Sequence, residues 1–219
     1  MARVELIVFD FDGTLVDTAP DLIRATNRYL ETKGLPALAP NRIREAIGFG
    51  LKHLIAEVYP KERNTPAFLQ QIYEEFVGIY EQEYLRSPRL FDGAREFLND
   101  WAGQIAIVSN KRERFIHPIL GQLGIERLPW AAIVGGDTFA NMKPHPEPFL
   151  AAMQAANVNP EQTLILGDGV PDVTGAMAVG AKAVAVEFGY TPARQLLDLG
   201  AWKSLRSFYE LSALIGSIT

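Results

Sequence analysis

Cysteine is absent from the 219-residue chain, and its absence excludes several kinds of site at once. Without thiols the protein can have no disulfide framework, no thiolate metal site and no cysteine nucleophile. The fold therefore requires no particular redox compartment.

Clustered positive charge and long hydrophobic runs are also missing. The chain has 21 lysines and arginines against 26 aspartates and glutamates, and the basic residues are scattered rather than gathered into a stripe. This pattern argues against a nucleic-acid surface. No apolar run reaches the roughly 18 residues of a membrane span, and the apolar stretch before Asp10 is too short for a signal peptide. We expect a soluble, cytoplasmic protein without nucleic-acid or membrane partners.

Short, continuously apolar runs recur along the chain, which is 48% apolar and long enough to bury a sizeable core. Continuous rather than alternating runs indicate strands buried on both faces of a parallel sheet. Segments with helical spacing separate the last four runs, so the order predicts a doubly wound, Rossmann-like α/β core. The runs cover residues 4–9, 104–108, 131–134, 163–166 and 181–186.

Residues 17–85 contain helical patterns and no convincing strand, which predicts an inserted, all-helical cap subdomain. One helix is expected to begin after Thr18, with the Thr18 hydroxyl as its cap, and to end near Gly34. Another carries the aromatic stripe Phe68, Tyr73, Phe76 and Tyr80, which we interpret as cap core. The catalytic core then comprises residues 1–16 and 86–219, with linkers near Val16 and Ser87-Pro88.

Polar residues stand directly after the apolar runs. In open α/β sheets, ligands bind beyond the carboxyl ends of the strands, so these residues are expected to share one edge. Packed aspartates would raise one another's pKa values unless a cation compensates, which indicates a metal, and oxygen-only ligands favour Mg²⁺. The residues that follow the first, second and fourth runs are Asp10, Asp12, Ser109, Asn110, Lys111, Asp168 and Asp172.

Lys143 lies in a proline-rich loop after the third run, where its ammonium group could face phosphate oxygens. Ser109 and the backbone amides around Asn110 could hydrogen-bond the same group. A magnesium site of this kind suits phosphoryl transfer, and carboxylates are established nucleophiles in such reactions. Asp168 and Asp172 could alternatively be a turn and a helix N-cap.

The segment Asp10-Phe-Asp-Gly-Thr-Leu-Val-Asp17 resembles motif I of the haloacid-dehalogenase-like superfamily, and the later strand ends resemble its other motifs in the right order. Ser109 corresponds to motif II, Lys143 to motif III, and the Gly167-Asp168 to Asp172 segment to motif IV. The resemblance covers essentially the whole chain. It departs from the common pattern at Pro171 and at Ser109.

This resemblance implies a role for each motif residue. Asp10 would attack phosphorus, while Asp12 would first protonate the leaving alkoxide and then deprotonate water. Magnesium would be bound by Asp10, the backbone carbonyl of Asp12, and Asp168, with Asp172 supporting its water shell or Lys143. Phosphate-binding residues would be Thr14, Ser109, Asn110 and Lys143.

The inserted helical unit is similar to the C1-type cap of the superfamily, which closes over small substrates. Its segment Ile47-Gly-Phe-Gly-Leu-Lys-His53 resembles the cap loop of phosphoglycolate phosphatases, which implies 2-phosphoglycolate as substrate and contacts from Gly48, Phe49, Gly50 and Lys52. The two glycines could equally end one helix and begin the next, leaving Phe49, Lys52 and His53 without a role.

Other functions on the same scaffold stay open, namely a phosphosugar mutase, a pyrophosphatase, a dehalogenase or a phosphatase for another small phosphate. Asp12 counts against a dehalogenase, which has no alkoxide to protonate. A non-catalytic phospho-acceptor domain also combines aspartates, a hydroxyl, a lysine and magnesium, but it places the acceptor after its third strand. The expected partner is a small phosphorylated metabolite, and the chain is expected to be a monomer or homodimer.

Overall fold

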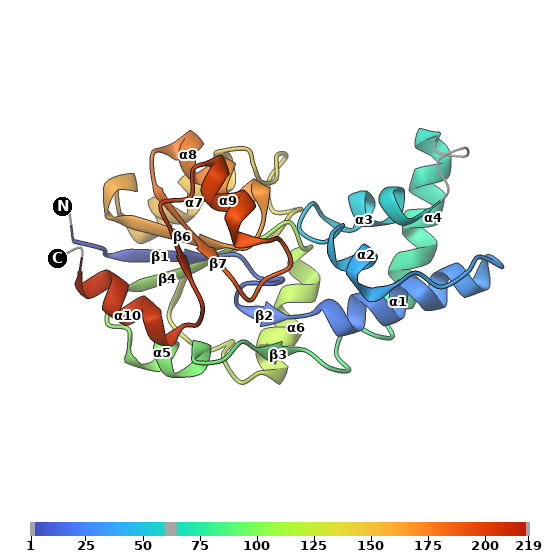
Figure 1. Ribbon diagram of the computed structural model, residues 1–219, viewed down its shortest axis with the longest axis horizontal. Helices are drawn as coiled ribbons and strands as arrows, with labels where there is room; N and C mark the ends of the chain where they lie inside the picture. The colour runs from blue at the N-terminus through green and yellow to red at the C-terminus, as the bar shows by residue number, and fades with distance from the viewer. Residues whose placement is uncertain (1–2, 60–64, 218–219) are drawn as a thin grey trace.

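A computed structural model, which describes residues 3–59 and 65–217, places a strand-rich lobe beside a helical lobe (Figure 1). The strand-rich lobe contains a six-stranded sheet in which all neighbouring strands run parallel. The prediction of a doubly wound α/β core is confirmed. In spatial order the strands are β5 (Trp130–Val134), β4 (Gln104–Val108), β1 (Leu6–Phe9), β6 (Thr163–Gly167), β7 (Lys182–Val186) and β8 (Lys203–Leu205).

Helices cover both faces of this sheet, as the continuously apolar strands require. In β1, Ile7 and Phe9 face one hydrophobic cluster, and Leu6 and Val8 face the other. The first cluster packs against α5 (Ala94–Asp100), α6 (Glu113–Gln122) and α10 (Tyr209–Gly216). The second packs against α7 (Glu147–Ala156), α8 (Val170–Val179) and α9 (Ala193–Leu199), and the 3-10 turn η2 (Pro160–Gln162) leads into β6.

The helical lobe has a hydrophobic cluster of its own, which includes Tyr29, Ile55, Phe76 and Tyr80. Phe115 of α6 also belongs to this cluster, so the helical lobe packs directly on the sheet lobe. The division at residues 17 and 85 stays a prediction. The helices are α1 (Ala19–Thr32), α2 (Pro40–Arg44), α3 (Leu51–Val58) and α4 (Pro66–Tyr80).

A short antiparallel ribbon joins the two lobes where the linkers were expected. It consists of β2 (Val16–Asp17) and β3 (Arg89–Leu90), and the Arg89 guanidinium lies 2.9 Å from an Asp17 oxygen. Next to the ribbon, Glu83 is buried and accepts hydrogen bonds from Arg24 and Arg28 of α1. The start and the end of the helical insertion are therefore tied together by charged contacts.

The predicted capping role of the Thr18 hydroxyl is wrong. Thr18 does precede α1, but its backbone has φ −107° and ψ −3°, whereas a capping residue is usually extended, and its hydroxyl donates to Asp12 Oδ1 at 2.5 Å. The backbone N–H of Ala19 donates instead to the Tyr190 hydroxyl at 3.0 Å and to Asp17 at 3.3 Å. Side chains from two separate loops thus accept the hydrogen bonds of the first backbone N–H group of α1.

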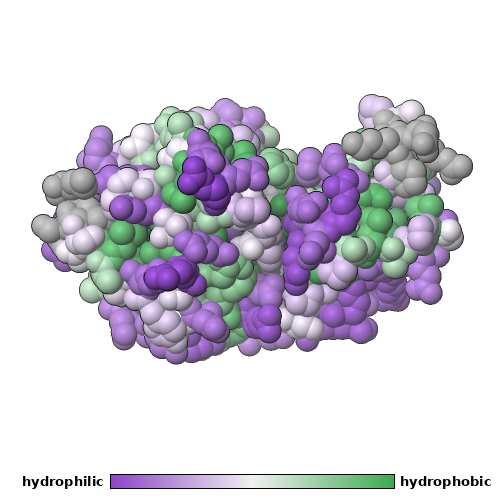
Figure 2. All heavy atoms as spheres, in the orientation of Figure 1, coloured by the Kyte–Doolittle hydropathy of each residue, from purple (hydrophilic) through white to green (hydrophobic). Residues whose placement is uncertain are grey.

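Hydrophilic and hydrophobic residues are interspersed over the visible surface of both lobes, and the outline is hollowed between them (Figure 2). In residues 3–59 and 65–217, no helix has the length and apolar composition needed to cross a membrane.

Candidate active site

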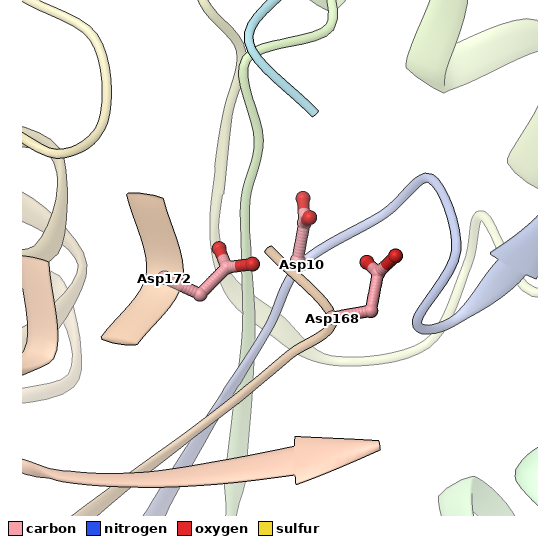
Figure 3. A group of neighbouring side chains, drawn as sticks. All are labelled: Asp10, Asp168 and Asp172. Atoms are coloured by element: carbon pink, nitrogen blue, oxygen red, sulfur yellow. The ribbon is translucent and has the colours of Figure 1, made fainter. Parts of the chain in front are cut away.

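Three buried aspartates converge at the carboxyl edge of the sheet (Figure 3). Asp10 directly follows β1, Asp168 follows β6, and Asp172 lies in the first turn of α8. One oxygen of each carboxylate lies within 4.8 Å of the others, and the three residues are only 5%, 4% and 2% exposed. The adjacency of β1 and β6 therefore brings together residues that are about 160 positions apart, as the sequence predicted.

Lys143 is the cation of this cluster. Its Nζ lies 2.7 Å from Asp10 Oδ1 and 2.6 Å from Asp172 Oδ1, and it is itself buried. Three ionised carboxylates against one ammonium leave two negative charges uncompensated, which one divalent cation would neutralise. Oxygen ligands at this spacing fit Mg²⁺, so the residues present suit the predicted metal.

The pKa values of two of these aspartates are raised. Burial is the main cause for Asp10, and the Asp172 charge adds to it, while Lys143 opposes both. Burial and then Asp172 raise the pKa of Asp168 to about 7. Both shifts report the cost of concentrating negative charge away from water, a cost that a bound cation would remove.

Asp168 is held rigidly by its surroundings. A Cβ on Gly13, whose φ is +84°, or on Gly189 would overlap the Asp168 side chain, so both positions require glycine. The Thr14 hydroxyl donates to Asp168 Oδ1 at 3.0 Å, and the Tyr190 backbone N–H donates to Oδ2 at 2.8 Å. Thr14, predicted to bind phosphate, is fully buried, and its hydroxyl donates to this carboxylate.

Asp12 belongs to a second group. Its carboxylate accepts hydrogen bonds from Lys111 Nζ at 2.9 and 3.1 Å and from the Thr18 hydroxyl at 2.5 Å. The Asp12 side chain is not among the residues that could hold a metal in the described part of the chain. A contribution of its backbone carbonyl to the metal stays a prediction.

A small pocket lies between the sheet edge and the helical lobe. Its polar wall includes Asp10, Asp12 and Ser109, so the two motif I aspartates open into the same space. The facing wall, contributed by the helical lobe, is apolar apart from glycine backbone. That wall consists of Leu22, Ile47, Gly48, Gly50, Leu51 and Leu54.

Asn110 joins the two walls of the pocket. Its side-chain amide donates to the carbonyl of Gly48 at 3.0 Å and to the carbonyl of Lys143 at 3.1 Å. Its carbonyl oxygen Oδ1 is buried and has no hydrogen-bond partner in the described residues. Asn110 therefore lines the pocket and ties the cap loop to the core.

The predicted cap-loop residues divide between two spaces. Gly48 and Gly50 line the pocket, whereas Phe49 and Lys52 line an adjoining outer hollow. The Lys52 ammonium lies 5.2 Å from the centre of the Tyr73 ring in that hollow. Gly50 also borders the outer hollow, so the loop forms the partition between the two spaces.

His53, left without an assignment, has its ring 4.8 Å from the Phe49 ring, and neither residue lines the inner pocket.

Sequence reasoning assigned no role to three residues of the site, namely Tyr80, Lys111 and Tyr190. Lys111 directly follows Ser109-Asn110, and its position after a strand placed it among the polar residues expected at the sheet edge. Tyr190 follows β7 by the same rule, and its hydroxyl donates to Asp17 at 3.1 Å while its N–H contacts Asp168. Tyr80 carries no such signal, because it lies in the aromatic stripe of α4.

Comparison with known proteins finds similarity across the whole site. The sequence profile of a family described as haloacid dehalogenase-like hydrolase matches residues 7–186, which include Asp10, Lys143 and Asp172. A phosphoglycolate phosphatase from Chromobacterium violaceum is 34% identical over 221 residues, covering 98% of both chains.

An N-acetylmuramic acid 6-phosphate phosphatase from Pseudomonas putida is 34% identical over 191 residues, covering 86% of this chain and 85% of that one. A crystal structure described as a predicted phosphoglycolate phosphatase from Haemophilus somnus has a TM-score of 0.87 at 28% identity. It covers 98% of this chain and 99% of that one.

Proposed function

The chain belongs to the haloacid dehalogenase-like hydrolase family, and from this membership we propose that it hydrolyses a small phosphomonoester through an aspartyl-phosphate on Asp10. It is a phosphatase, as the relatives with 34% identity over most of its length are. The observation that carries the proposed mechanism is that Asp10 and Asp12 open into one pocket beneath the helical lobe.

In the first step, an Asp10 oxygen attacks phosphorus and the bond from phosphorus to the ester oxygen breaks. Asp12, in its acid form, gives its proton to the departing alkoxide. The products of this step are the free alcohol, the aspartyl-phosphate and ionised Asp12.

In the second step, Asp12 accepts a proton from a water molecule as the water oxygen attacks the same phosphorus. The bond between phosphorus and Asp10 breaks, inorganic phosphate leaves, and Asp12 is again in its acid form. One residue therefore serves as acid and then as base, which requires that its side chain keep one position through both displacements.

Asp10, Asp168 and Asp172 would hold Mg²⁺, which when bound supplies positive charge for the phosphoryl oxygens. Lys143 adds a positive charge on the same side, since its ammonium contacts Asp10 directly. Ser109 is buried at the pocket wall, where its hydroxyl supports the proposed phosphate binding. The apolar wall from the helical lobe excludes water during the first displacement.

We propose 2-phosphoglycolate as the substrate. The pocket is small, and α3 begins at Leu51 on its wall, with Gly50 beside it. The first N–H groups of a helix lack intrahelical partners and attract anions, which suits the carboxylate of a glycolate leaving group.

N-acetylmuramic acid 6-phosphate is a second candidate, favoured by the outer hollow that adjoins the pocket and by the relative named for this activity. The adjoining outer hollow would give a larger leaving group room beyond Gly50. A cytoplasmic location and a monomeric or homodimeric state stay predictions.

A phosphate-release screen with and without Mg²⁺ tests the proposal. Its substrates would be 2-phosphoglycolate, N-acetylmuramic acid 6-phosphate, hexose phosphates, nucleotides and pyrophosphate, ranked by kcat/KM. We expect Mg²⁺-dependent turnover with 2-phosphoglycolate ranked first. A first rank for N-acetylmuramic acid 6-phosphate would select the second candidate. Transfer of phosphate between hexose positions faster than its release would favour a mutase, and release of less than one phosphate per chain would contradict phosphatase activity.

A further inference from the structure

A second buried lysine, Lys111, makes contacts that differ in kind from those of Lys143. Its ammonium donates to both oxygens of Asp12, at 2.9 and 3.1 Å, and to the Tyr80 hydroxyl at 2.7 Å. An ammonium group has three N–H bonds, so these acceptors use all of its hydrogen-bonding capacity. Lys111 is therefore engaged by Asp12 and Tyr80 rather than free for a phosphate group.

The backbone of Lys111 is fixed by the neighbouring loop. Its carbonyl accepts a hydrogen bond from the Gly136 N–H at 2.8 Å, and a Cβ on Gly136 would overlap the backbone of Asn110. The backbone of Lys111 is thus held in a fixed position at the sheet edge. The position of its ammonium group depends on the contacts of the side chain.

Tyr80 sets that position from the helical lobe. It is the last residue of α4, it is fully buried, and its ring packs edge-on against Phe115 of the sheet lobe with 5.0 Å between ring centres. The Phe76 ring stacks on the Tyr80 ring, with 6.2 Å between ring centres. The hydroxyl of Tyr80 is therefore held on an aromatic cluster that moves with α4.

We propose that Tyr80 and Lys111 are positioning residues, which act through Asp12 by holding its carboxyl group in line with the ester oxygen. The chain of contacts runs from α4 through the Tyr80 hydroxyl and the Lys111 ammonium to both oxygens of Asp12. Proton transfer to the leaving group then depends on the placement of the helical lobe. This inference rests on the proposed role of Asp12 as acid and base.

The protonation states of the two groups agree with this geometry. Burial lowers the pKa of Lys111, but the nearby Asp12 charge and Tyr80 outweigh burial, so the net shift is upward and the ammonium form persists. Burial raises the pKa of Tyr80 to about 12, so the phenol stays neutral. An ammonium donating to a carboxylate and a phenol is a stable arrangement for the ionised, base form of Asp12, because charged hydrogen bonds are the strong ones.

The dependence on leaving group separates this role from a purely structural one. An alkyl phosphate such as 2-phosphoglycolate needs a proton at the departing oxygen, whereas p-nitrophenyl phosphate releases a stable phenolate without one. The value of kcat/KM reports the steps up to the first phosphoryl transfer. A residue that acts through the acid therefore affects kcat/KM for the alkyl ester selectively, while a general loss of structure affects both esters alike.

The experiment compares kcat/KM for 2-phosphoglycolate and p-nitrophenyl phosphate in the wild type and in Asp12→Asn, Lys111→Met, Tyr80→Phe and Tyr84→Phe. Tyr84 is the matched control, because its ring packs on Tyr80 and on Phe115 but its hydroxyl has no hydrogen bond within the part of the chain described. We expect Tyr80→Phe to lower kcat/KM for 2-phosphoglycolate by about 10-fold and Lys111→Met by about 100-fold, which does not exceed the factor of about 10²–10⁴ that acid–base catalysis supplies. Both variants should change kcat/KM for p-nitrophenyl phosphate by less than about threefold, and Tyr84→Phe should change kcat/KM for neither ester.

Asp12→Asn distinguishes the failure of this inference from that of the proposed function. If Asp12→Asn lowers kcat/KM equally for both esters, the acid role of Asp12 is wrong. Suppose instead that Asp12→Asn lowers kcat/KM selectively for the alkyl ester. If Tyr80→Phe and Lys111→Met then lower kcat/KM equally for both esters, or change it for neither, the positioning role is overturned. Thermal melting monitors the folding of each variant. If Tyr80→Phe does not fold, Lys111→Gln replaces it. Lys111→Gln should lower kcat/KM for 2-phosphoglycolate selectively, and an equal loss for both esters would overturn the inference.

Discussion

The two lysine groups of the site differ in where their members come from. Lys143 contacts Asp10 and Asp172, and all three belong to the sheet lobe. Lys111 contacts Asp12 and Tyr80, and Tyr80 belongs to the helical lobe. The first group is thus fixed by the sheet alone, while the second is completed only where the two lobes meet.

This difference matches the chemistry proposed for each group. Attack on phosphorus and metal binding are common to every phosphate ester, and they fall to the Lys143 group. Protonation depends on the leaving group, and it falls to the Lys111 group, next to the wall that contacts the leaving group. The comparison predicts that changes in the first group abolish all activity, whereas changes in the second discriminate between substrates.

The largest effect is expected for Asp10→Asn. The amide cannot form the covalent intermediate, so kcat should fall by more than about 10⁴-fold for alkyl and aryl esters alike. Steady-state phosphate release with both ester types measures this. Near wild-type, Mg²⁺-dependent turnover in the purified variant would refute the nucleophile assignment.

Asp12→Asn is expected to have the next largest effect and to show the contrast between the groups. Loss of a positioned acid and base typically costs about 10²–10⁴-fold, so kcat for 2-phosphoglycolate should fall by at least two decades. Phosphoenzyme formation from p-nitrophenyl phosphate, followed in a pre-steady-state burst, should be much less affected. A melting curve like that of the wild type serves as the control for folding.

Mg²⁺ binding is expected to have a smaller effect, which is measured as the stability of the folded protein. The Lys143 group and Asp168 together have two uncompensated negative charges when ionised, so Mg²⁺ at 100 times its dissociation constant should stabilise the folded wild type by about 2.7 kcal/mol. In Asp168→Asn this stabilisation should largely disappear. Thermal melting with and without Mg²⁺ makes the comparison, and equal stabilisation of both proteins would place the ion elsewhere.

The smallest effect is expected in the cap loop. Lys52 lines the outer hollow rather than the inner pocket, so Lys52→Ala should change kcat/KM for 2-phosphoglycolate by less than about threefold. Gly50→Ala is its counterpart, because Gly50 has φ +86° and lies against the Asn110 carbonyl on the partition. A larger loss for Lys52→Ala than for Gly50→Ala would restore Lys52 as a contact of the small ester.

The sequence predicted the sheet and the Lys143 group well, for a physical reason. Continuous apolar runs reveal buried parallel strands, and the residue after each strand lies at a known edge. Asp10, Asp168 and Lys143 could therefore be assigned to one site without coordinates. The two-residue strands of the ribbon, Val16–Asp17 and Arg89–Leu90, are too short to show any periodicity.

The Lys111 group was less predictable because it depends on how the lobes are placed. Tyr80 has the helical spacing of a core residue, and only the packing of α4 on Phe115 brings its hydroxyl to Lys111. Thr18 has the sequence of a helix cap, yet its hydroxyl donates to the carboxylate of Asp12, six residues earlier in the chain. Local sequence propensity predicts where each helix forms, but it does not predict which group on the other lobe a side chain of that helix contacts.

Trapping the covalent intermediate tests the central claim most directly. The wild type would be quenched in acid during turnover of 2-phosphoglycolate with Mg²⁺, digested, and analysed by mass spectrometry. We predict an acid-stable, hydroxylamine-sensitive phosphoryl group on the peptide that contains Asp10. In Asp12→Asn the amount of this phosphopeptide should increase when p-nitrophenyl phosphate, whose leaving group needs no proton, replaces 2-phosphoglycolate. Phosphate on a different residue, or oxygen from labelled water entering inorganic phosphate with no phosphopeptide formed in either protein, would contradict it.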